Sequence, residues 1–314
     1  MLQIFAAYVI DLIIGDPRHI PHPVVIIGKG IDAAEKVLRR FAAPVLGLKL
    51  SGLILTVIIV GVTYAAMRGI VKGAYRLDHW VGIITEIWFL STTIAVKGLS
   101  SAAMEIYSLL DKGDLSEARR KVGWIVGRDT QSMDEGEITR ATVETVSENI
   151  VDGIIAPLFY AFIGGVPLAM AYKAVNTLDS MVGYRNEKYM EFGWASAKFD
   201  DLCNLIPARV TGFILLITFL VTGRPVKNAL KMIQRDACKH PSPNSGIPEA
   251  AMAGALGVRL GGLNYYGGVE SFRAYMGDSV TGLKKAHILD TVRIMHVASV
   301  ITLAAGAVVL YLIS

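Results

Sequence analysis

A polar stretch that runs directly into a membrane-length apolar segment constrains this 314-residue chain more than any other feature. Glu144, Glu148 and Asp152 recur every four residues where the apolar run begins. A helix places residues four apart on one face, so the three carboxylates are predicted to form a single stripe. A carboxylate that enters a bilayer is costly unless it faces a cavity, a partner or a metal ion. We therefore expect this stripe to belong to a functional site.

Composition and apolar run lengths indicate an integral membrane protein. Hydrophobic residues make up 53% of the chain and charged residues only 18%, a more apolar balance than soluble domains have. We predict an all-α, polytopic integral membrane helical bundle of about five or six membrane segments, one of them re-entrant as an alternative, with cytoplasmic helical loops. The whole chain, residues 1–314, is predicted to be a single integral-membrane domain. The predicted segments are Met1–Ile14, Leu46–Met67, Trp80–Val96, Ile150–Tyr172, Leu205–Val221 and Ile294–Ile313.

The charge distribution predicts the orientation and excludes some partners. The net charge is only +4 and no basic patch alternates with aromatic residues, so nucleic acid is not an expected partner. Most of the 31 Lys and Arg residues lie in the connections, which is typical of cytoplasmic loops. The first apolar run has no Lys or Arg before it, so it is predicted to be a retained helix rather than a signal peptide. Cys203 and Cys238 form no CxxC pair and predict neither a zinc site nor a disulfide framework.

The carboxylate stripe and the loop at residues 15–23 could each bind more than one kind of ligand. Glu148, Asn149 and Asp152 suit Mg²⁺, which favours one or two carboxylates plus substrate phosphates. The same groups could hold the ammonium of an amine substrate or act as a general base, and a solvated helix face pairing with Arg140 is the alternative. Three prolines predict an extended loop at residues 15–23, whose imidazoles, guanidinium and carboxylate could bind phosphate, metal or a carboxylate substrate. These loop residues are Asp16, Arg18, His19 and His22.

Four further groups of polar residues, at residues 176–185, 200–209, 240–246 and 261–268, lie next to apolar segments. The first follows a break in the apolar segment that begins at residue 150. The break at Gly164–Pro167 predicts a discontinuous or re-entrant helix of the kind that lines sites in membrane proteins, with a turn that returns the chain toward Glu148. The loop from His240 to Gly246 is rich in hydroxyl groups suited to an anion, although no Walker A sequence is present. The glycine-rich stretch at residues 261–268 allows close backbone approach, and its tyrosines could stack on a flat ligand. The polar residues of these groups are Asn176, Asp179, Tyr184, Arg185, Asp200, Asp201, Asn204, Arg209, His240, Asn244, Tyr265 and Tyr266.

Taken together, these motifs resemble the CobD/CbiB family, the adenosylcobinamide-phosphate synthases of cobalamin biosynthesis. The resemblance covers most of the chain, because the motifs run in order from residue 15 to residue 268. They read GDPRHIPHPVVIIG, VGRDT, VETVSENIVDGIIAPLFY, YKAVNTLDSMVGY, FDDLCNLIPAR, RDACKHPSPNSGIPEAAMAGALGVRLGG and NYYGG.

The resemblance implies a multi-pass enzyme of the cell inner (cytoplasmic) membrane with its active site facing the cytoplasm. Such an enzyme joins adenosylcobyric acid to (R)-1-aminopropan-2-ol O-phosphate, or to the free aminopropanol, in an amide-forming ligation with ATP and Mg²⁺. Other late membrane enzymes of cobalamin assembly are expected partners besides the substrates and the lipid bilayer. A membrane transporter or binding protein for a corrinoid or metal ion is the alternative, although no repeated half is detectable.

Read with this resemblance, the polar residues receive predicted roles. The catalytic set is Glu144, Glu148 and Asp179, with Asp179 as general base. The predicted metal ligands are Asp16, Glu148, Asp152 and Asp201. The predicted substrate- and phosphate-binding residues are Arg18, His19, His22, Asn149, Asn176, Tyr184, Arg185, Arg209, His240, Asn244, Tyr265 and Tyr266.

Overall fold

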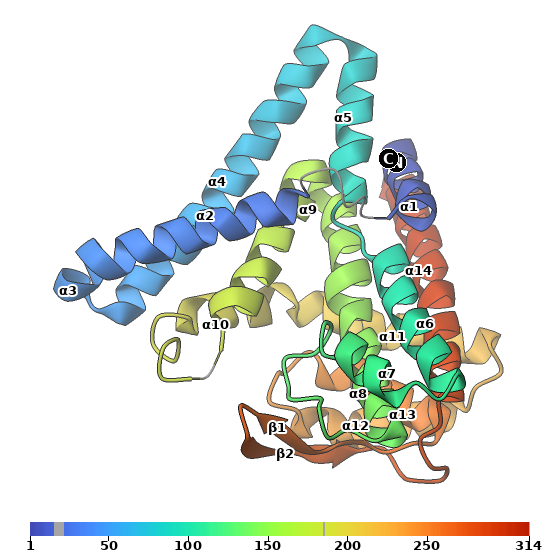
Figure 1. Cartoon of the computed structure of the whole chain (residues 1–314). Coiled ribbons are helices and arrows are strands. Elements are labelled where there is room, and N and C mark those ends of the chain that lie inside the picture. The colour runs from blue at the N-terminus through green and yellow to red at the C-terminus, as the bar shows by residue number, and fades with distance from the viewer. Residues whose placement is uncertain (16–21, 185, 314) are drawn as a thin grey trace. The chain divides into compact units, whose positions relative to one another are not determined.

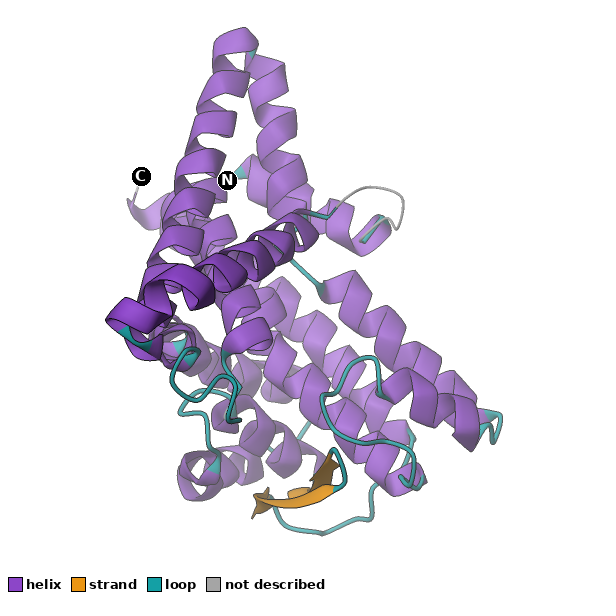
Figure 2. Ribbon diagram, turned by 60° about the vertical axis from the view of Figure 1, so that its left-hand side comes forward, coloured by secondary structure: helices purple, strands orange, loops and turns teal. Residues whose placement is uncertain are grey.

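The protein is almost entirely helical, as the sequence predicts (Figure 1). The computed structural model describes residues 1–15, 22–184 and 186–313. Figure 2 shows an unpredicted element of these residues, a two-stranded antiparallel hairpin among the helices. The chain divides into two compact units whose segments alternate along the sequence. Unit 1 contains Met1–Ala95, Ala156–Asn204 and Gly306–Ser314, and unit 2 contains Val96–Ile155 and Leu205–Ala305.

The described helices make this a multi-pass membrane protein. Four are long and apolar enough to cross a membrane, and a broken pair of helices, Trp194–Cys203 with Leu205–Val221, would make a fifth. The N-terminal helix has only 12 residues, which is about 18 Å at 1.5 Å per residue, shorter than the hydrocarbon core. The described residues therefore contain four candidate spans, or five with the broken pair, and five agrees with the lower predicted count. The four spans are Leu48–Leu77, His79–Asp111, Glu135–Val182 and Ala286–Ile313.

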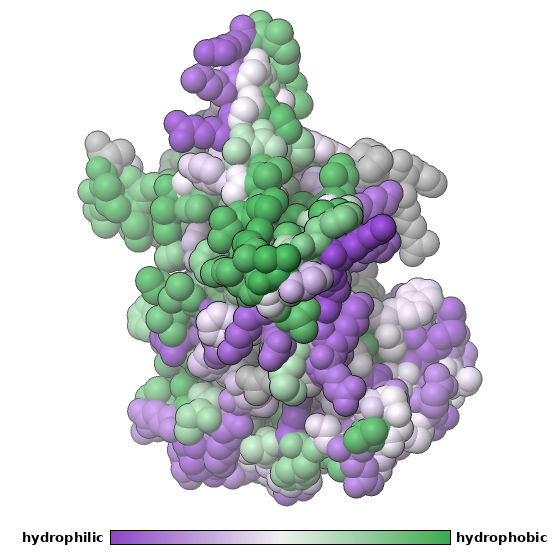
Figure 3. Space-filling view, turned by 90° about the vertical axis from the view of Figure 1, so that its left-hand side faces the viewer, coloured by the Kyte–Doolittle hydropathy of each residue, from purple (hydrophilic) through white to green (hydrophobic). Residues whose placement is uncertain are grey.

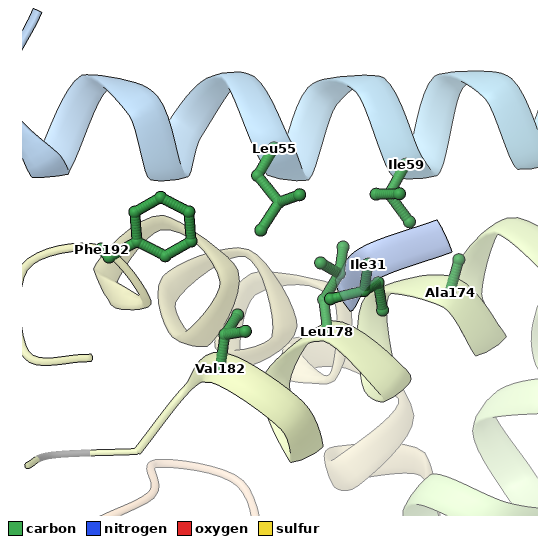
Figure 4. Packing of buried hydrophobic residues seen from close by; sticks show 7 residues of the cluster. All are labelled: Ile31, Leu55, Ile59, Ala174, Leu178, Val182 and Phe192. Atoms are coloured by element: carbon green, nitrogen blue, oxygen red, sulfur yellow. The ribbon is translucent and has the colours of Figure 1, made fainter. Parts of the chain in front are cut away.

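Unit 1 is built around the contact of α4 with α9 and α2. Apolar side chains from these helices and from the loop before α10 point toward one another (Figure 4). Phe192, Leu55 and Ile31 are fully buried in this cluster. The helices of unit 1 are α1 (Leu2–Ile13), α2 (Pro23–Val37), α3 (Ala43–Leu46), α4 (Leu48–Leu77), α5 (His79–Ser91), α9 (Ala156–Val182) and α10 (Trp194–Cys203), with a π-helical turn, η1, at Leu38–Ala42.

The predicted break in the apolar segment after residue 150 is confirmed. Gly164 and Gly165 have non-helical backbone angles inside α9, and Pro167 follows them. Gly165 has φ of +61°, a conformation that glycine adopts without the Cβ penalty of other residues. Helical structure resumes after the break and continues to the end of α9. The rings of Tyr160, before the break, and Tyr172, after it, stack with their centroids 5.0 Å apart, whereas twelve residues of continuous helix would span about 18 Å. The chain therefore turns back at the break, as the re-entrant alternative predicts.

Unit 2 carries the carboxylate stripe and the hairpin. Its helix α8 begins with a capping box in which the side chains of Asp134 and Glu137 each accept a hydrogen bond from the other's backbone N–H. Strands β1 (Leu260–Tyr266) and β2 (Val269–Met276) pair antiparallel, with an irregularity between Leu260 and Gly262. The helices of unit 2 are α6 (Val96–Asp111), α7 (Leu115–Val122), α8 (Glu135–Ile150), α11 (Leu205–Val221), α12 (Val226–Asp236), α13 (Gly246–Leu256) and most of α14 (Ala286–Ile313), with a π-helical turn, η2, at Val151–Ile155 and a short 3₁₀ turn, η3, at Ala237–Lys239.

Candidate functional site

Glu144 is the centre of a buried polar network that joins α8 to the hairpin. Its Oε2 accepts a hydrogen bond from Arg128 Nη2 at 2.7 Å, and its Oε1 accepts one from the backbone N–H of Gly261 at 2.8 Å. Arg140 lies 3.6 Å from the same carboxylate. Arg128 also donates to the Asn264 side chain, and the side chains of Arg128 and Glu144 are each only 5% exposed. Glu144 is therefore paired on both of its oxygens.

The network requires the hairpin to approach α8 closely. Gly261 has φ of +82°, and a Cβ added there would lie 2.4 Å from the carbonyl oxygen of Ala274. Arg140 donates to the carbonyl oxygens of Gly261 and Leu263 in β1. Because Glu144 and Arg140 are saturated by these contacts, we assign both a positioning role: they hold the hairpin against α8. The prediction that Glu144 is catalytic stays untested.

Beside this network lies a small cavity into which Glu148 opens. Its volume is about 130 Å³, whereas sites for drug-sized ligands measure about 300–1,000 Å³. The cavity is thus matched to one end of a substrate, such as a phosphate or amine group. Glu148 Oε1 accepts a hydrogen bond from the Ser245 hydroxyl at 3.0 Å. The described lining residues are Ile125, Val126, Gly127, Arg128, Glu144, Thr145, Glu148, Asn149, Tyr266 and Arg273.

The cavity brings two guanidinium groups close to a carboxylate. Arg128 and Arg273 both line it together with Glu148, and Arg273 Nη2 lies 3.5 Å from the hydroxyl oxygen of Tyr266. Burial lowers the pKa of Arg273, but Tyr266 and the surrounding glutamates outweigh this and raise it. Arg273 therefore stays charged. The cavity is thus lined by two guanidinium groups and two carboxylates, and Glu144 is already paired with Arg128. Arg273 and Arg128 can contribute to neutralising an oxyanion, while Glu148 can hold an ammonium group or a metal ion.

Only part of the predicted stripe lines the cavity. Glu144 and Glu148 line it together with Asn149, whereas Asp152 is not among its described lining residues. Asp152 lies in η2, a π-helical turn that directly follows α8. Its role as a metal ligand stays a prediction.

The loop between η3 and α13 supports Glu148. Asn244, next to Ser245 in the chain, accepts a hydrogen bond from Arg209 Nη1 at 2.7 Å. The Ser242 hydroxyl in turn accepts from the backbone N–H groups of Asn244 and Ser245. The structure thus joins the predicted residues Arg209, Asn244 and Glu148 into one chain of contacts through Ser245.

A buried imidazole and carboxyl pair lies close to this loop. His240 Nε2 and Glu249 Oε1 are 3.5 Å apart, and Glu249 is only 1% exposed. Burial, reinforced by the charges of Glu144 and Glu148, raises the pKa of Glu249 well above its ordinary value of 4.5. Burial also lowers the pKa of His240 below its ordinary 6.5, against a smaller opposing effect of Glu148. Both directions favour a neutral pair, with a protonated Glu249 and an uncharged His240.

Replacing Glu249 by glutamine is expected to make stability less dependent on pH. A carboxyl group whose pKa is raised by folding stabilises the folded state fully below its unfolded value of 4.5, and this contribution is lost as pH rises toward the folded value. Glutamine mimics the neutral acid and has no such loss. We therefore expect the melting temperature of Glu249→Gln minus that of the wild type, both measured in detergent, to increase from pH 5 to pH 8. A constant difference over this range would mean that Glu249 is ionised in the folded protein.

The hairpin tyrosines differ in their positions. Tyr266 lines the cavity, whereas the Tyr265 hydroxyl donates to Glu270 at 3.1 Å on an exposed part of the hairpin. The turn between the strands is fixed by Asp129, whose carboxylate accepts hydrogen bonds from the backbone N–H groups of Gly267 and Gly268. Of the two predicted stacking residues, Tyr266 is the one beside the cavity.

Several predicted residues belong to unit 1 instead. His22 accepts a hydrogen bond from the backbone N–H of Val24 and caps the N-terminus of α2. Asp201 pairs with Lys198 at 3.2 Å. Tyr184 is 54% exposed. Asn176 and Asp179 lie on the last part of α9. The predictions for Asp16, Arg18, His19 and Arg185 lie outside the described residues.

Reasoning from the sequence missed four residues that build the site. Asn264 and Arg273 could not be identified because the hairpin was taken for a loop, so their alternation on one face was not visible. Arg128 and Glu249 do lie inside the motifs VGRDT and RDACKHPSPNSGIPEAAMAGALGVRLGG. A charged residue in an otherwise apolar or glycine-rich motif was the available signal for both.

The geometry fits a metal ion only in part. No group of three or more His, Cys, Asp or Glu side chains converges as a metal site among the residues that the structure describes. Mg²⁺ does not need such a group, since one or two carboxylates, water and substrate phosphates complete its shell. Glu148 supplies one carboxylate at the cavity, so its donor set fits an ion that arrives with a phosphate.

Comparisons with known proteins give one consistent result. The family model described as "CobD/Cbib protein" matches residues 4–295. A cobalamin biosynthesis protein CobD from Geobacter metallireducens is 47% identical over 97% of this chain and 95% of its own length. CobD from Citrobacter koseri and CbiB from Salmonella typhi, also named cobalamin biosynthesis proteins, are each 46% identical over 95% of this chain and 93% of their own lengths. No solved structure matches the chain significantly.

Proposed function

The chain belongs to the CobD/CbiB family, whose members are named as cobalamin biosynthesis proteins, and from this premise we propose that it is an ATP-dependent amide ligase. Its acid substrate would be adenosylcobyric acid. Its amine substrate would be (R)-1-aminopropan-2-ol O-phosphate or the free aminopropanol, and the phosphorylated amine would give adenosylcobinamide phosphate. The reaction would take place at the cytoplasmic face of the inner membrane.

The observation that carries this proposal is the cavity that Glu148, Arg128 and Arg273 line together. A carboxylate is a poor acyl donor, so ligation needs activation by phosphate and a site that neutralises phosphate charge. Two fixed guanidinium groups meet this need. Glu148 complements them, because a carboxylate binds the ammonium form of the amine and supports its deprotonation. The small volume of the cavity suits the reacting end of the amine, with the corrin ring outside it.

The proposed chemistry has two steps. An oxygen of the substrate carboxylate attacks the terminal phosphorus of ATP, which breaks the bond to ADP and forms an acyl phosphate. The neutral amine then attacks the acyl carbon, phosphate leaves with the oxygen of the former carboxylate, and the amine proton passes to a base. Arg128 and Arg273 would hold the phosphate, and Glu148 would orient the amine and accept its proton directly or through water. Mg²⁺, when bound with the phosphates, would neutralise their charge.

The test is amide formation by the purified protein in detergent, with ATP, Mg²⁺, adenosylcobyric acid and the amine. A ligase is expected to form the amide without any membrane and to consume one ATP per amide. The rival function is a transporter or binding protein for a corrinoid or metal ion. Absence of amide, together with corrinoid or metal uptake by sealed proteoliposomes, would support that rival and overturn the proposal.

A further inference from the structure

An apolar groove in unit 1 plays no part in the proposed reaction. It has a volume of about 790 Å³ and is lined by side chains of α2, α4 and α5, with Met170 of α9. Ile26 on α2 and Val62 on α4 are 63% and 61% exposed although both line it. Sites for whole drug-sized ligands measure about 300–1,000 Å³. The groove is therefore large enough for a long apolar ligand.

The setting of the groove determines what can fill it. One wall consists of residues 58–70 of α4, one of the four helices long and apolar enough to cross a membrane. Within a bilayer such an open apolar surface contacts acyl chains rather than water. Figure 3 looks onto the side of the molecule that carries α2 and α3, and hydrophobic residues gather there next to hydrophilic ones. An acyl chain is the apolar ligand that this setting supplies.

One rim of the groove is positively charged. Lys29 and Lys36 are exposed and seven residues apart, which places them on one stripe of α2. Arg40 is exposed in the π-helical turn η1 that directly follows α2. This stripe adjoins the face of α2 that lines the groove through Ile26, Ala33 and Val37. No described carboxylate lies within 4.0 Å of the three side-chain cations. The cations are thus available to a ligand in the groove.

The other side of α2 and of η1 packs against the rest of unit 1. Arg39 donates to Glu35 at 2.7 Å and to the carbonyl oxygen of Lys188 at 2.8 Å. Its guanidinium also lies over the ring of Phe192, 4.2 Å from the centroid. These contacts fix the rotation of α2 and direct Lys29, Lys36 and Arg40 away from the core of unit 1.

We propose that this groove and its basic rim form a binding site for one anionic phospholipid. The acyl chains would lie along α2 and α4, and the phosphate would lie between Lys36 and Arg40, with Lys29 facing the headgroup. Basic residues beside a membrane helix attract anionic lipid headgroups. The apolar groove alone would accept any lipid, and the stripe gives the preference for negative charge. This site is independent of the ligation proposed above.

Native mass spectrometry of the delipidated full chain in detergent tests the site, with phosphatidylglycerol and phosphatidylcholine as probes. The wild type is expected to retain one phosphatidylglycerol in preference to phosphatidylcholine. Replacing Lys29, Lys36 and Arg40 together by glutamine should weaken phosphatidylglycerol binding about a hundredfold, because each cation contributes roughly fivefold to the affinity. The matched control replaces Lys112, Lys227 and Lys231, three exposed cations of unit 2, and should bind like the wild type.

A second variant tests the groove itself. Gly30 lies on α2, where an added Cβ would have only Ile59 near it, at 3.8 Å. Gly30→Leu therefore fills the groove while favouring the helix, and it should weaken binding of both lipids. Wild-type binding of phosphatidylglycerol by either variant, or equal loss in the unit 2 control, would overturn the proposal. A protein dimer that Gly30→Leu abolishes, with no lipid retained, would identify a second copy as the occupant instead and would also overturn it.

Discussion

Glu148→Gln is expected to abolish ligation while the protein remains folded. The substitution keeps the shape of the side chain, and its amide oxygen can still accept the hydrogen bond from Ser245. It removes the negative charge that would hold the ammonium or the metal ion beside Arg128 and Arg273. Loss of a general base or charge of this kind lowers rates by about 10²–10⁴-fold. The measurement is amide formed per minute by purified protein, with the melting temperature as a check on folding.

The matched control for this variant is Glu135→Gln, the same change on an exposed residue at the start of the same helix. It should have nearly wild-type activity, because an exposed residue away from the cavity contributes little. If Glu148→Gln also turned over like the wild type, Glu148 would be a solvated helix residue and the proposed site would lose its carboxylate.

Breaking the buried pair of Arg128 and Glu144 should strongly destabilise unit 2. Each side chain is 5% exposed, and each is the other's ionic partner at 2.7 Å. Removing one partner of such a pair leaves an uncompensated buried charge and costs about 3–5 kcal/mol. We therefore expect large losses for Arg128→Met and for Glu144→Gln, measured as the free energy of unfolding in detergent.

The double variant gives the sharper result. With both charges removed, neither Arg128 nor Glu144 is left uncompensated and only Arg140 loses an ionic partner. The loss of the double variant should therefore be at least about 1 kcal/mol smaller than the sum of the single losses. Arg120→Met serves as the control, because Arg120 pairs with Glu117 at the surface and its loss should not be measurable. Additive single losses would mean that Arg128 and Glu144 stabilise the fold independently rather than as a pair.

The helices of the site could be predicted from local sequence signals. The capping box at Asp134 and Glu137 locates the start of α8 because both of its hydrogen bonds form within one turn. The four-residue spacing correctly placed Glu144 and Glu148 on one face, since both line the cavity. Arg209 and Asn244 were predicted as binding residues, and their mutual contact at 2.7 Å became visible only in the structure.

The remainder of the site depends on features with weak local signals. The hairpin was not predicted because its glycines at 261, 262, 267 and 268 weaken the strand pattern. For the same reason Asn264 and Arg273 were not predicted as site residues. Residues 151–155, which include Asp152, form a π turn, and no spacing rule predicts such a turn. Glu249 meets His240 across a loop, and its burial depends on the packing of α13.

Transfer of isotopic oxygen tests the central claim of ATP-dependent amide formation most directly. Adenosylcobyric acid labelled with ¹⁸O in its free carboxylate would be mixed with the purified wild type, ATP, Mg²⁺ and the amine. We predict one ¹⁸O atom in inorganic phosphate for every amide formed, because phosphate leaves with a carboxylate oxygen. The Glu148→Gln variant should give neither amide nor labelled phosphate. Unlabelled phosphate accompanying the amide, or ATP hydrolysis without any amide, would contradict the account.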